Sequence, residues 1–281
     1  MLEEKCCTVT CGIPLNKTYW DNQYHAHNIG WDLGEVSPPI KSYIDKLQDK
    51  GMAILIPGCG NCYEAEYLLQ QGFTNITIID IAPTLVNTLK NKFKNSAAIS
   101  IVLGNFFEHL GKYDLIIEQT FFCALPPYLR QKYIWKMHQL LTEHGLLAGL
   151  LFNRQFEISP PFGGNQTQYE KLFQKAFVFN SLNIASNSVP SRANAELFIE
   201  FQKNNFVQVN LYHFKGITCI GCMNTVTNKF FEIDGVMNVS MNTDFSEILM
   251  VTKKEIPLKK LREMVSYDEK YKINKTKKQE R

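Results

Sequence analysis

The fold predicted for this chain follows from eight residues, Ala53-Ile54-Leu55-Ile56-Pro57-Gly58-Cys59-Gly60. The first four form an apolar run of buried-strand length, and the two glycines permit a sharp turn after it. A helical pattern follows and stops at Gly72. A β-branched strand over residues 76–80 then ends in an acid, Asp80. This order of strand, turn, helix, strand and acid predicts a ligand site at the turn.

Strands and helices keep alternating up to residue 152. Three more strands are expected at 100–103, 113–118 and 145–152, and further helices at 40–47, 83–93 and 127–141. This alternation predicts an α/β fold with a Rossmann-like, doubly wound parallel sheet. Ligands of such sheets lie beyond the carboxyl ends of the strands. The topology therefore places the following segments around one cleft: Gly58–Cys62, Asp80, Asn105 and Gln119–Cys123.

The predicted ligand contains a nucleoside. Gly58 and Gly60 allow close approach of the backbone, and the helix after them offers a partial positive charge. Asp80 follows Gly58 by 22 residues, a spacing typical of an acid that binds ribose hydroxyls. Tyr63 occupies a position where a dinucleotide fingerprint requires glycine. The turn therefore favours S-adenosylmethionine (SAM) over NAD.

A second domain is expected after residue 204, with the junction at 203–205. Strand and helix patterns there follow the order βαββαβ within about 65 residues, which is typical of a ferredoxin-like fold. The predicted organisation is an arm at 1–15, a SAM-binding α/β domain at 16–204, this small domain at 205–270 and a basic tail at 271–281.

Composition narrows the function classes. The chain has 281 residues, of which 45% are hydrophobic and 20% charged, so it is not a disordered chain. The net charge of +3 is concentrated in the last twelve residues, which hold six basic residues and one acid. No aromatic residues are interleaved to form a nucleic-acid surface, so we do not expect such a partner. No apolar run is long enough to cross a bilayer and no export signal is visible, so we expect a cytoplasmic monomer.

Residues 16–203 resemble the thiopurine S-methyltransferase family, which includes thiol and halide methyltransferases. Six ordered segments carry the resemblance: Tyr19-Trp20-Asp21, Gly30-Trp31-Asp32-Leu33-Gly34, Ile56-Pro57-Gly58-Cys59-Gly60, Glu118-Gln119-Thr120-Phe121-Phe122-Cys123-Ala124-Leu125, Pro160-Pro161-Phe162, and Arg192 with Glu196-Leu197-Phe198. The resemblance implies SAM as methyl donor and a small soft nucleophile as acceptor. Aromatic rings suit a cationic sulfonium, and methyl transfer needs alignment and a dry site more than proton chemistry.

The resemblance also implies site residues. Those expected to bind the cofactor are Trp20, Tyr24, Trp31, Gly34, Gly58, Gly60, Asp80, Ile81, Asn105, Phe106 and Gln119. Those expected to bind the acceptor are Phe121, Phe122 and Arg192. Two positions depart from the family: Tyr24 stands where Trp is common, and Asn105 where Asp is usual. No residue is assigned to proton transfer, and Tyr24 and Arg192 are candidates for positioning only. Two roles stay open for Arg192, attraction of an anionic acceptor or bracing of the loop around Glu196.

Residues 206–271 resemble heavy-metal-associated domains through Gly216-Ile217-Thr218-Cys219-Ile220-Gly221-Cys222. Two thiols at a helix start, Cys219 and Cys222, suit a soft ion such as Cu(I) or Hg(II). A redox pair and a copy that binds nothing are the alternatives. Cys59 and Cys62 repeat the spacing, but Cys59 belongs to the methyltransferase turn. Cys6, Cys7 and Cys11 are unexplained.

The sequence thus predicts an enzyme that methylates a small thiol, thiopurine, chalcogen, metalloid or halide-like acceptor. A tethered metal domain is expected to deliver a metal-bound acceptor or sense metal in detoxification, since tethering raises effective concentration. Its expected partners are the small-molecule acceptor and a metal donor or acceptor protein, without a membrane. The alternative is a metal chaperone or sensor whose methyltransferase fold is catalytically weak.

Overall fold

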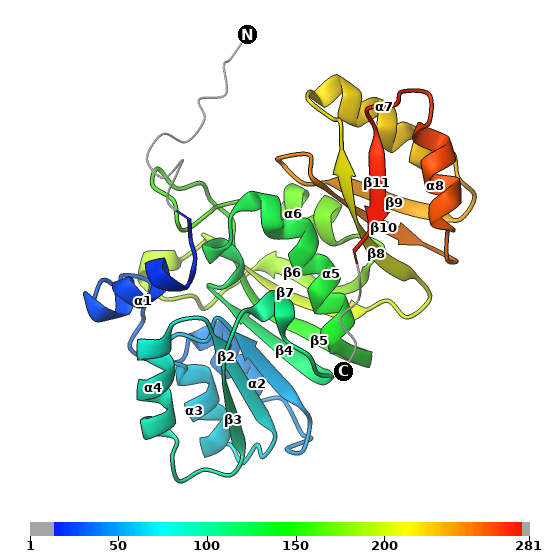
Figure 1. Cartoon of the computed structure of the whole chain (residues 1–281). Coiled ribbons are helices and arrows are strands. Elements are labelled where there is room, and N and C mark those ends of the chain that lie inside the picture. Colours follow the sequence, from blue (N-terminus) through cyan, green and yellow to red (C-terminus); the bar gives the residue numbers. More distant parts are fainter. Residues whose placement is uncertain (1–13, 277–281) are drawn as a thin grey trace.

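The computed structural model describes residues 14–276. The arm cysteines Cys6, Cys7 and Cys11 lie outside these residues. Within the described residues the larger sheet has seven strands in the order β3-β2-β1-β4-β5-β7-β6 (Figure 1). The strands are β1 (Ile54–Pro57), β2 (Ile76–Asp80), β3 (Ile99–Leu103), β4 (Tyr113–Gln119), β5 (Leu141–Phe152), β6 (Phe177–Ile184) and β7 (Glu196–Lys203).

Helices cover both faces of this sheet. They are α1 (Lys17–His25), α2 (Pro38–Ile44), α3 (Tyr63–Gln70), α4 (Pro83–Lys92), α5 (Arg130–Leu140) and α6 (Gln166–Phe173). Alternate residues of β1 face opposite sides: Ile54 and Ile56 pack in a cluster with α2, α3 and α4. Leu55 packs in a second cluster with α5 and α6. This two-sided burial explains why β1 is apolar throughout.

The predicted parallel sheet is confirmed for the five strands up to residue 152, but two further strands that were not predicted make the sheet mixed. Strands β1 to β5 are parallel, but β7 runs antiparallel to both β5 and β6. Between β6 and β7 there is only a short 3-10 turn, η4 (Pro190–Arg192), and no helix for a parallel crossover, so these two strands pair as antiparallel neighbours. The helix expected at 127–141 also divides, into a 3-10 turn η3 (Pro127–Leu129) and α5.

A separate four-stranded antiparallel sheet follows, in the order β11-β8-β10-β9. Its elements are β8 (Gln208–Lys215), α7 (Ile220–Phe231), β9 (Val236–Met241), β10 (Glu247–Thr252), α8 (Leu258–Val265) and β11 (Lys272–Lys275). We had predicted a basic tail at 271–281. Residues 272–275 instead form β11, which pairs with β8 in this sheet. Residues 277–281 of that tail lie outside the described part.

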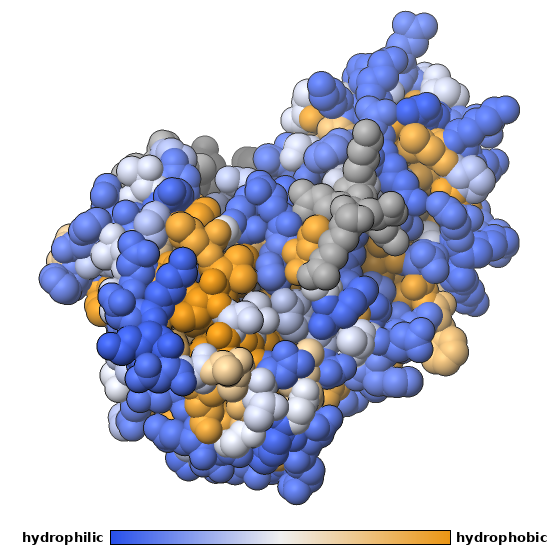
Figure 2. Space-filling view, turned by 60° about the horizontal axis from the view of Figure 1, so that its bottom comes forward, coloured by the Kyte–Doolittle hydropathy of each residue, from blue (hydrophilic) through white to orange (hydrophobic). Residues whose placement is uncertain are grey.

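Both faces of the smaller sheet are covered. Tyr212 and Met250 face α7 and α8. Leu211, Leu249 and Val251 instead belong to the same apolar cluster as α5 of the larger unit. The two units are therefore packed together, with no free linker between them. Figure 2 shows a mostly hydrophilic face of the molecule, on which an extensive group of hydrophobic residues lies in a hollow and smaller groups appear elsewhere.

Candidate active site

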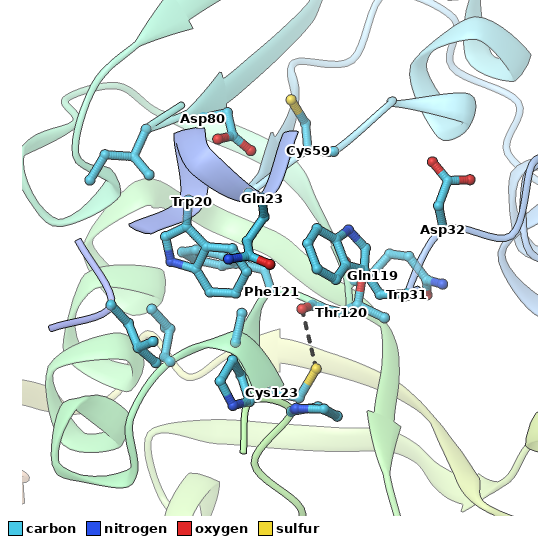
Figure 3. Close-up of a pocket in the computed structure, with 18 of the residues that line it drawn as sticks. Trp20, Gln23, Trp31, Asp32, Cys59, Asp80, Gln119, Thr120, Phe121 and Cys123 are labelled. Atoms are coloured by element: carbon cyan, nitrogen blue, oxygen red, sulfur yellow. Dashed lines mark hydrogen bonds between the residues drawn. The ribbon is translucent and has the colours of Figure 1, made fainter. Parts of the chain in front are cut away.

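A cavity of about 880 Å³ lies beyond the carboxyl ends of β1, β2 and β4, where the topology predicts it. Its walls come from the turn after β1, the end of β2, the start of the segment after β4, and helix α1 with the loop that follows (Figure 3). Of the residues predicted to bind the cofactor, this cavity is lined by Trp20, Tyr24, Trp31, Gly58, Gly60, Asp80, Ile81, Asn105, Phe106 and Gln119.

The turn after β1 requires glycine at two positions. Gly58 and Gly60 have φ angles of +55° and +52°, which L side chains rarely adopt. A Cβ atom on Gly58 would also overlap the ring of Phe121. The Gly58 amide donates to the Ile79 carbonyl over 2.8 Å, which ties the turn to β2. Neither glycine places a side chain of its own between the backbone and the cavity.

Asp80 ends β2 and is almost completely buried. Burial raises the pKa of its carboxyl from 3.8 to about 6, against hydrogen bonds from backbone amides that lower it. One of these comes from Ala82, whose amide donates to Asp80 Oδ1 over 2.9 Å. The group is thus a carboxylate at neutral pH, held in place by the chain.

Aromatic rings from α1 and the following loop cover the cavity. The Trp20 and Trp31 rings meet edge to face with centroids 5.7 Å apart, and Tyr24 meets Trp31 at 6.0 Å. Burial raises the pKa of the Tyr24 phenol well above its usual range. Gly34 does not line the cavity; its amide donates to Asp32 Oδ1 over 2.6 Å within the loop that carries Trp31.

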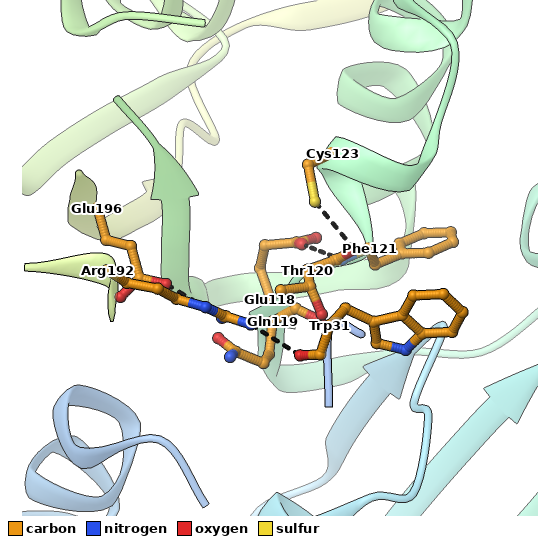
Figure 4. A network of polar contacts seen from close by, with 8 residues as sticks. All are labelled: Trp31, Glu118, Gln119, Thr120, Phe121, Cys123, Arg192 and Glu196. Atoms are coloured by element: carbon orange, nitrogen blue, oxygen red, sulfur yellow. Dashed lines mark hydrogen bonds and ion pairs between the residues drawn. The ribbon is translucent and has the colours of Figure 1, made fainter. Parts of the chain in front are cut away.

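Arg192 braces this aromatic cover. Its Nη2 donates to the Trp31 carbonyl over 2.7 Å, and its Nη1 lies 3.3 Å from Glu196 Oε1 (Figure 4). Its guanidinium also lies 5.4 Å from the centre of the Phe152 ring. Of the two roles considered for Arg192, bracing is thus visible in the contacts, while the same residue also lines the cavity.

The segment after β4 separates its two phenylalanines. Thr120 has a φ of 58°, and Glu118 accepts hydrogen bonds of 2.8 Å from the amides of both Phe121 and Phe122. Phe121 points into the cavity. Phe122 is 1% exposed and packs against Tyr133, with ring centroids 4.9 Å apart.

The prediction that Phe122 contacts the acceptor is therefore not supported by its position. Sequence reasoning could not separate the two rings, because the left-handed residue before them has no clear signature. Several other residues of the lining were not predicted as site residues at all, among them Gln23, Asp32, Arg154 and Phe156. Asp32 accepts a hydrogen bond from Asn61 Nδ2. The two residues are 29 positions apart in the sequence, so no local pattern predicts this contact.

The structure places the two Cys-x-x-Cys pairs in different surroundings. Cys219 is exposed at the start of α7, and its Sγ lies 3.0 Å from that of Cys222. The Cys222 thiol and amide stabilise the Cys219 thiolate by hydrogen bonds and lower its pKa. Cys59 and Cys62 are buried, and desolvation raises the pKa of the Cys59 thiol well above its usual range.

No third ligand joins the exposed pair among the described residues. Within residues 14–276 there is no group of three or more His, Cys, Asp or Glu side chains arranged to hold one metal ion. A tetrahedral zinc site is thus not built there, whereas a soft ion can use two thiolates.

A sequence model of the thiopurine S-methyltransferase family matches residues 15–210, about 70% of the chain. The chain belongs to this family. Its similar proteins include a probable thiol methyltransferase 2 of Arabidopsis thaliana, 29% identical over 176 residues that cover 60% of this chain and 77% of that protein. A thiopurine S-methyltransferase of Acinetobacter baylyi is 26% identical over 58% of this chain and 86% of that protein.

Solved structures show the same fold at low identity. A 1,6-didemethyltoxoflavin-N1-methyltransferase of Burkholderia thailandensis, with bound S-adenosylhomocysteine, has a TM-score of 0.56 at 16% identity and covers 67% of this chain and 87% of that one. A magnesium protoporphyrin IX methyltransferase from Synechocystis PCC 6803 has a TM-score of 0.55 at 13% identity, covering 70% of this chain and 100% of that one. The protein is thus a SAM-dependent methyltransferase with a Rossmann-like mixed sheet.

The family match ends near the start of the four-stranded sheet, so it says nothing of Cys219 and Cys222. Within residues 14–276, no helix combines the length and the apolar character needed to cross a membrane.

Proposed function

We propose that the protein methylates a small thiol or similarly soft nucleophile in the aromatic-lined cavity. The observation that carries this proposal is the cover of Trp20, Tyr24 and Trp31 over the glycine turn. Bound SAM supplies a methyl group on a positively charged sulfonium, and aromatic faces attract such a cation.

The residues around the turn fit SAM as the bound cofactor. The Oε1 atom of Gln119 is buried in the lining without a hydrogen-bond partner, so it offers an acceptor for an ammonium group. The Asp80 carboxylate offers acceptors for ribose hydroxyls. We assign the adenine end to Asn105, Phe106 and Ile81. Asn105 is fixed by the Phe107 amide, which donates to its Oδ1 over 3.0 Å.

The chain orients the acceptor and excludes water. Phe121 and Phe152 supply apolar walls, and Arg192 and Arg154 supply positive charge at the same cavity. These cations favour an ionised acceptor such as a thiolate. A thiolate reacts without giving up a proton in the site, so no general base is needed. Removing water from such an anion favours its reaction.

We infer further that residues 205–276 form a ferredoxin-like domain of the heavy-metal-associated type. The element order βαββαβ and the sheet order β11-β8-β10-β9 support this. Cys219 and Cys222 would bind a soft ion such as Cu(I) or Hg(II) as paired thiolates. A role in metal or metalloid detoxification, a metal-exchanging partner protein, a monomeric state and a cytoplasmic location remain predictions.

Two measurements test the methyltransferase proposal. Calorimetry measures SAM binding, and labelled SAM is used to assay hydrosulfide, 6-mercaptopurine, iodide, selenite and tellurite as acceptors. We expect binding, and product from at least one of the two thiols. Gly58→Ala should abolish binding because its Cβ overlaps Phe121. Gly51→Ala is the matched control, since its nearest neighbour is 3.5 Å away and it lies outside the cavity. Binding without product from any thiol would contradict the acceptor class.

A further inference from the structure

We propose that the turn between β9 and β10 fixes one wall of the cavity, the wall formed by residues 123–130, with Asn242 as the positioning residue for a bound acceptor. The kinetic part of this inference rests on the proposed thiol methylation. The structural part concerns residues 123–130, which we call the 123–130 segment, and does not depend on that activity.

Asn242 is held firmly within its own turn. It is 2% exposed, and its Oδ1 accepts from the Glu247 amide over 2.9 Å. Its Nδ2 donates to Ser246 Oγ over 3.1 Å. The same Nδ2 donates to the Tyr128 carbonyl over 3.0 Å, across the boundary between the two units. A buried side chain fixed at both ends transmits position well, because it has no alternative rotamer that keeps its bonds.

A second side chain, this one from the larger unit, links the same two segments. Gln131 lies in the first turn of α5, and its Nε2 donates to the Met241 carbonyl over 3.0 Å and to Ser240 Oγ over 3.2 Å. The end of β9 is thus joined to residues 128–131 by two side chains, one from each unit. Apolar packing of the smaller sheet on α5 surrounds these bonds.

The 123–130 segment lies between this turn and the cavity. Six of its residues line the cavity: Cys123, Ala124, Leu125, Pro126, Tyr128 and Leu129. Its conformation consists of two short 3-10 turns, η2 (Phe122–Ala124) and η3, which have weak internal hydrogen bonding. The segment therefore depends on outside contacts. At one end of the segment, the Phe162 amide donates a hydrogen bond to the Cys123 carbonyl over 2.6 Å. At the other end, Arg130 Nη2 donates to the Gly163 carbonyl over 2.7 Å.

The Asn242 bond supplies the outside contact at Tyr128. Without it, the partly buried Tyr128 carbonyl loses its donor from the second unit and the segment gains freedom. A bicyclic acceptor extends over more of the lining than a single-atom acceptor, so its binding should depend more on the segment. The C-terminal unit thus helps to determine which acceptors the enzyme accepts, whether or not it holds metal.

The test compares Asn242→Asp with Asn274→Ala. Asn242→Asp keeps the oxygen that accepts from Glu247 and removes the donor to Tyr128. Asn274 lies on β11 of the same sheet and accepts from Arg262 Nη2 over 2.9 Å, far from the cavity lining. The full-length variants are compared by hydrogen exchange at residues 123–130. They are also compared by KM and kcat for 6-mercaptopurine and hydrosulfide, and by SAM affinity.

Asn242→Asp should raise exchange in the 123–130 segment and raise KM for 6-mercaptopurine about tenfold, equivalent to about 1.4 kcal/mol. Its KM for hydrosulfide and its SAM affinity should stay within about twofold. Asn274→Ala should change none of these. Unchanged exchange, or faster exchange with an unchanged KM for 6-mercaptopurine, would overturn the inference.

The two proposals fail separately. If the wild-type protein methylates neither thiol, the proposed function fails. The inference is then decided by exchange and by calorimetric binding of 6-mercaptopurine in the presence of S-adenosylhomocysteine. Asn242→Ala gives a second variant that adds no charge, and it must shift both measurements in the same direction as Asn242→Asp for the inference to stand.

Discussion

The two Cys-x-x-Cys pairs, Cys59/Cys62 and Cys219/Cys222, share one spacing and differ in chemistry. The first pair follows a buried strand, with both side chains in the apolar cluster beneath α2, α3 and α4. The second opens an exposed helix, where hydrogen bonds lower the pKa of Cys219. Burial disfavours a thiolate, and amides at a helix start favour it. Spacing alone therefore does not tell a ligand pair from a packing pair; the surroundings decide.

The largest expected difference between the pairs is in metal binding. Cys219→Ser combined with Cys222→Ser should lose one bound Cu(I) per chain, because two thiolates of the exposed pair supply the proposed ligands. Competition with a chromophoric Cu(I) chelator measures this. Cys59→Ala combined with Cys62→Ala is the matched control and should keep the ion. Full retention by the first variant would show that this pair is not the site.

Alkylation should be at least about tenfold faster at Cys219 than at the buried thiols, because Cys219 is exposed and hydrogen bonds lower its pKa. Iodoacetamide at pH 7 should label Cys219 first. Cys59, Cys62 and Cys123 should react more slowly in the folded protein than after denaturation, because they are buried. Mass spectrometry of the peptides gives each rate. Equal alkylation rates of all four cysteines in the folded protein would contradict the predicted difference between the exposed and the buried pair.

The stability of the fold should depend more on the buried pair than on the exposed pair. Cys62→Ser places a hydroxyl in an apolar cluster and should lower the free energy of unfolding by about 2 kcal/mol. Cys219→Ser lies on the surface and should change it by less than about 0.5 kcal/mol. Urea denaturation of both variants measures the difference. A larger loss for Cys219→Ser would mean that the exposed thiol supports the fold.

The smallest expected effect concerns Asp80, which lines the same cavity as the buried pair Cys59 and Cys62. Burial raises the pKa of its carboxyl to about 6, so the group takes up a proton as the pH falls below that value. The protonated form accepts ribose hydroxyls less well. SAM affinity should therefore fall about tenfold between pH 7 and pH 5. Asp80→Asn should bind weakly at both values, and a wild-type affinity independent of pH would contradict the assignment of Asp80 to the ribose.

Local patterns predicted the parts of the fold that local physics determines. The strand at 54–57, the glycine turn and the acid at Asp80 were all placed from apolar runs and turn residues, and the structure brings them to one cavity. The helix predicted at 83–93 was also found within one residue of its expected bounds, as α4 (Pro83–Lys92). These elements have short-range causes: periodicity, glycine conformation and strand ends.

Other features were missed because they depend on distant partners. The antiparallel pair β6 and β7 is set by pairing with β5, not by a pattern of its own. Arg192 reaches Trp31 across 161 residues, and Asn242 reaches Tyr128 across 114. Phe121 faces the cavity and Phe122 faces the core, and the Glu118 carboxylate that accepts from both backbone amides holds this arrangement. No window of sequence contains such relations.

The shared cluster between the small sheet and α5 limits how the proposed metal-binding unit can act on the enzyme. Val209, Leu211, Leu249 and Val251 are all buried in that cluster. Exposing four aliphatic side chains would require about 6 to 12 kcal/mol, so an undocked state of the small unit would be rarely populated. A swinging arm that carries cargo from Cys219 into the cavity is thus strongly disfavoured. A bound ion could then affect methyl transfer only through the packed interface between the small sheet and α5. It would change the shape or stiffness of that interface and would not carry an acceptor into the cavity.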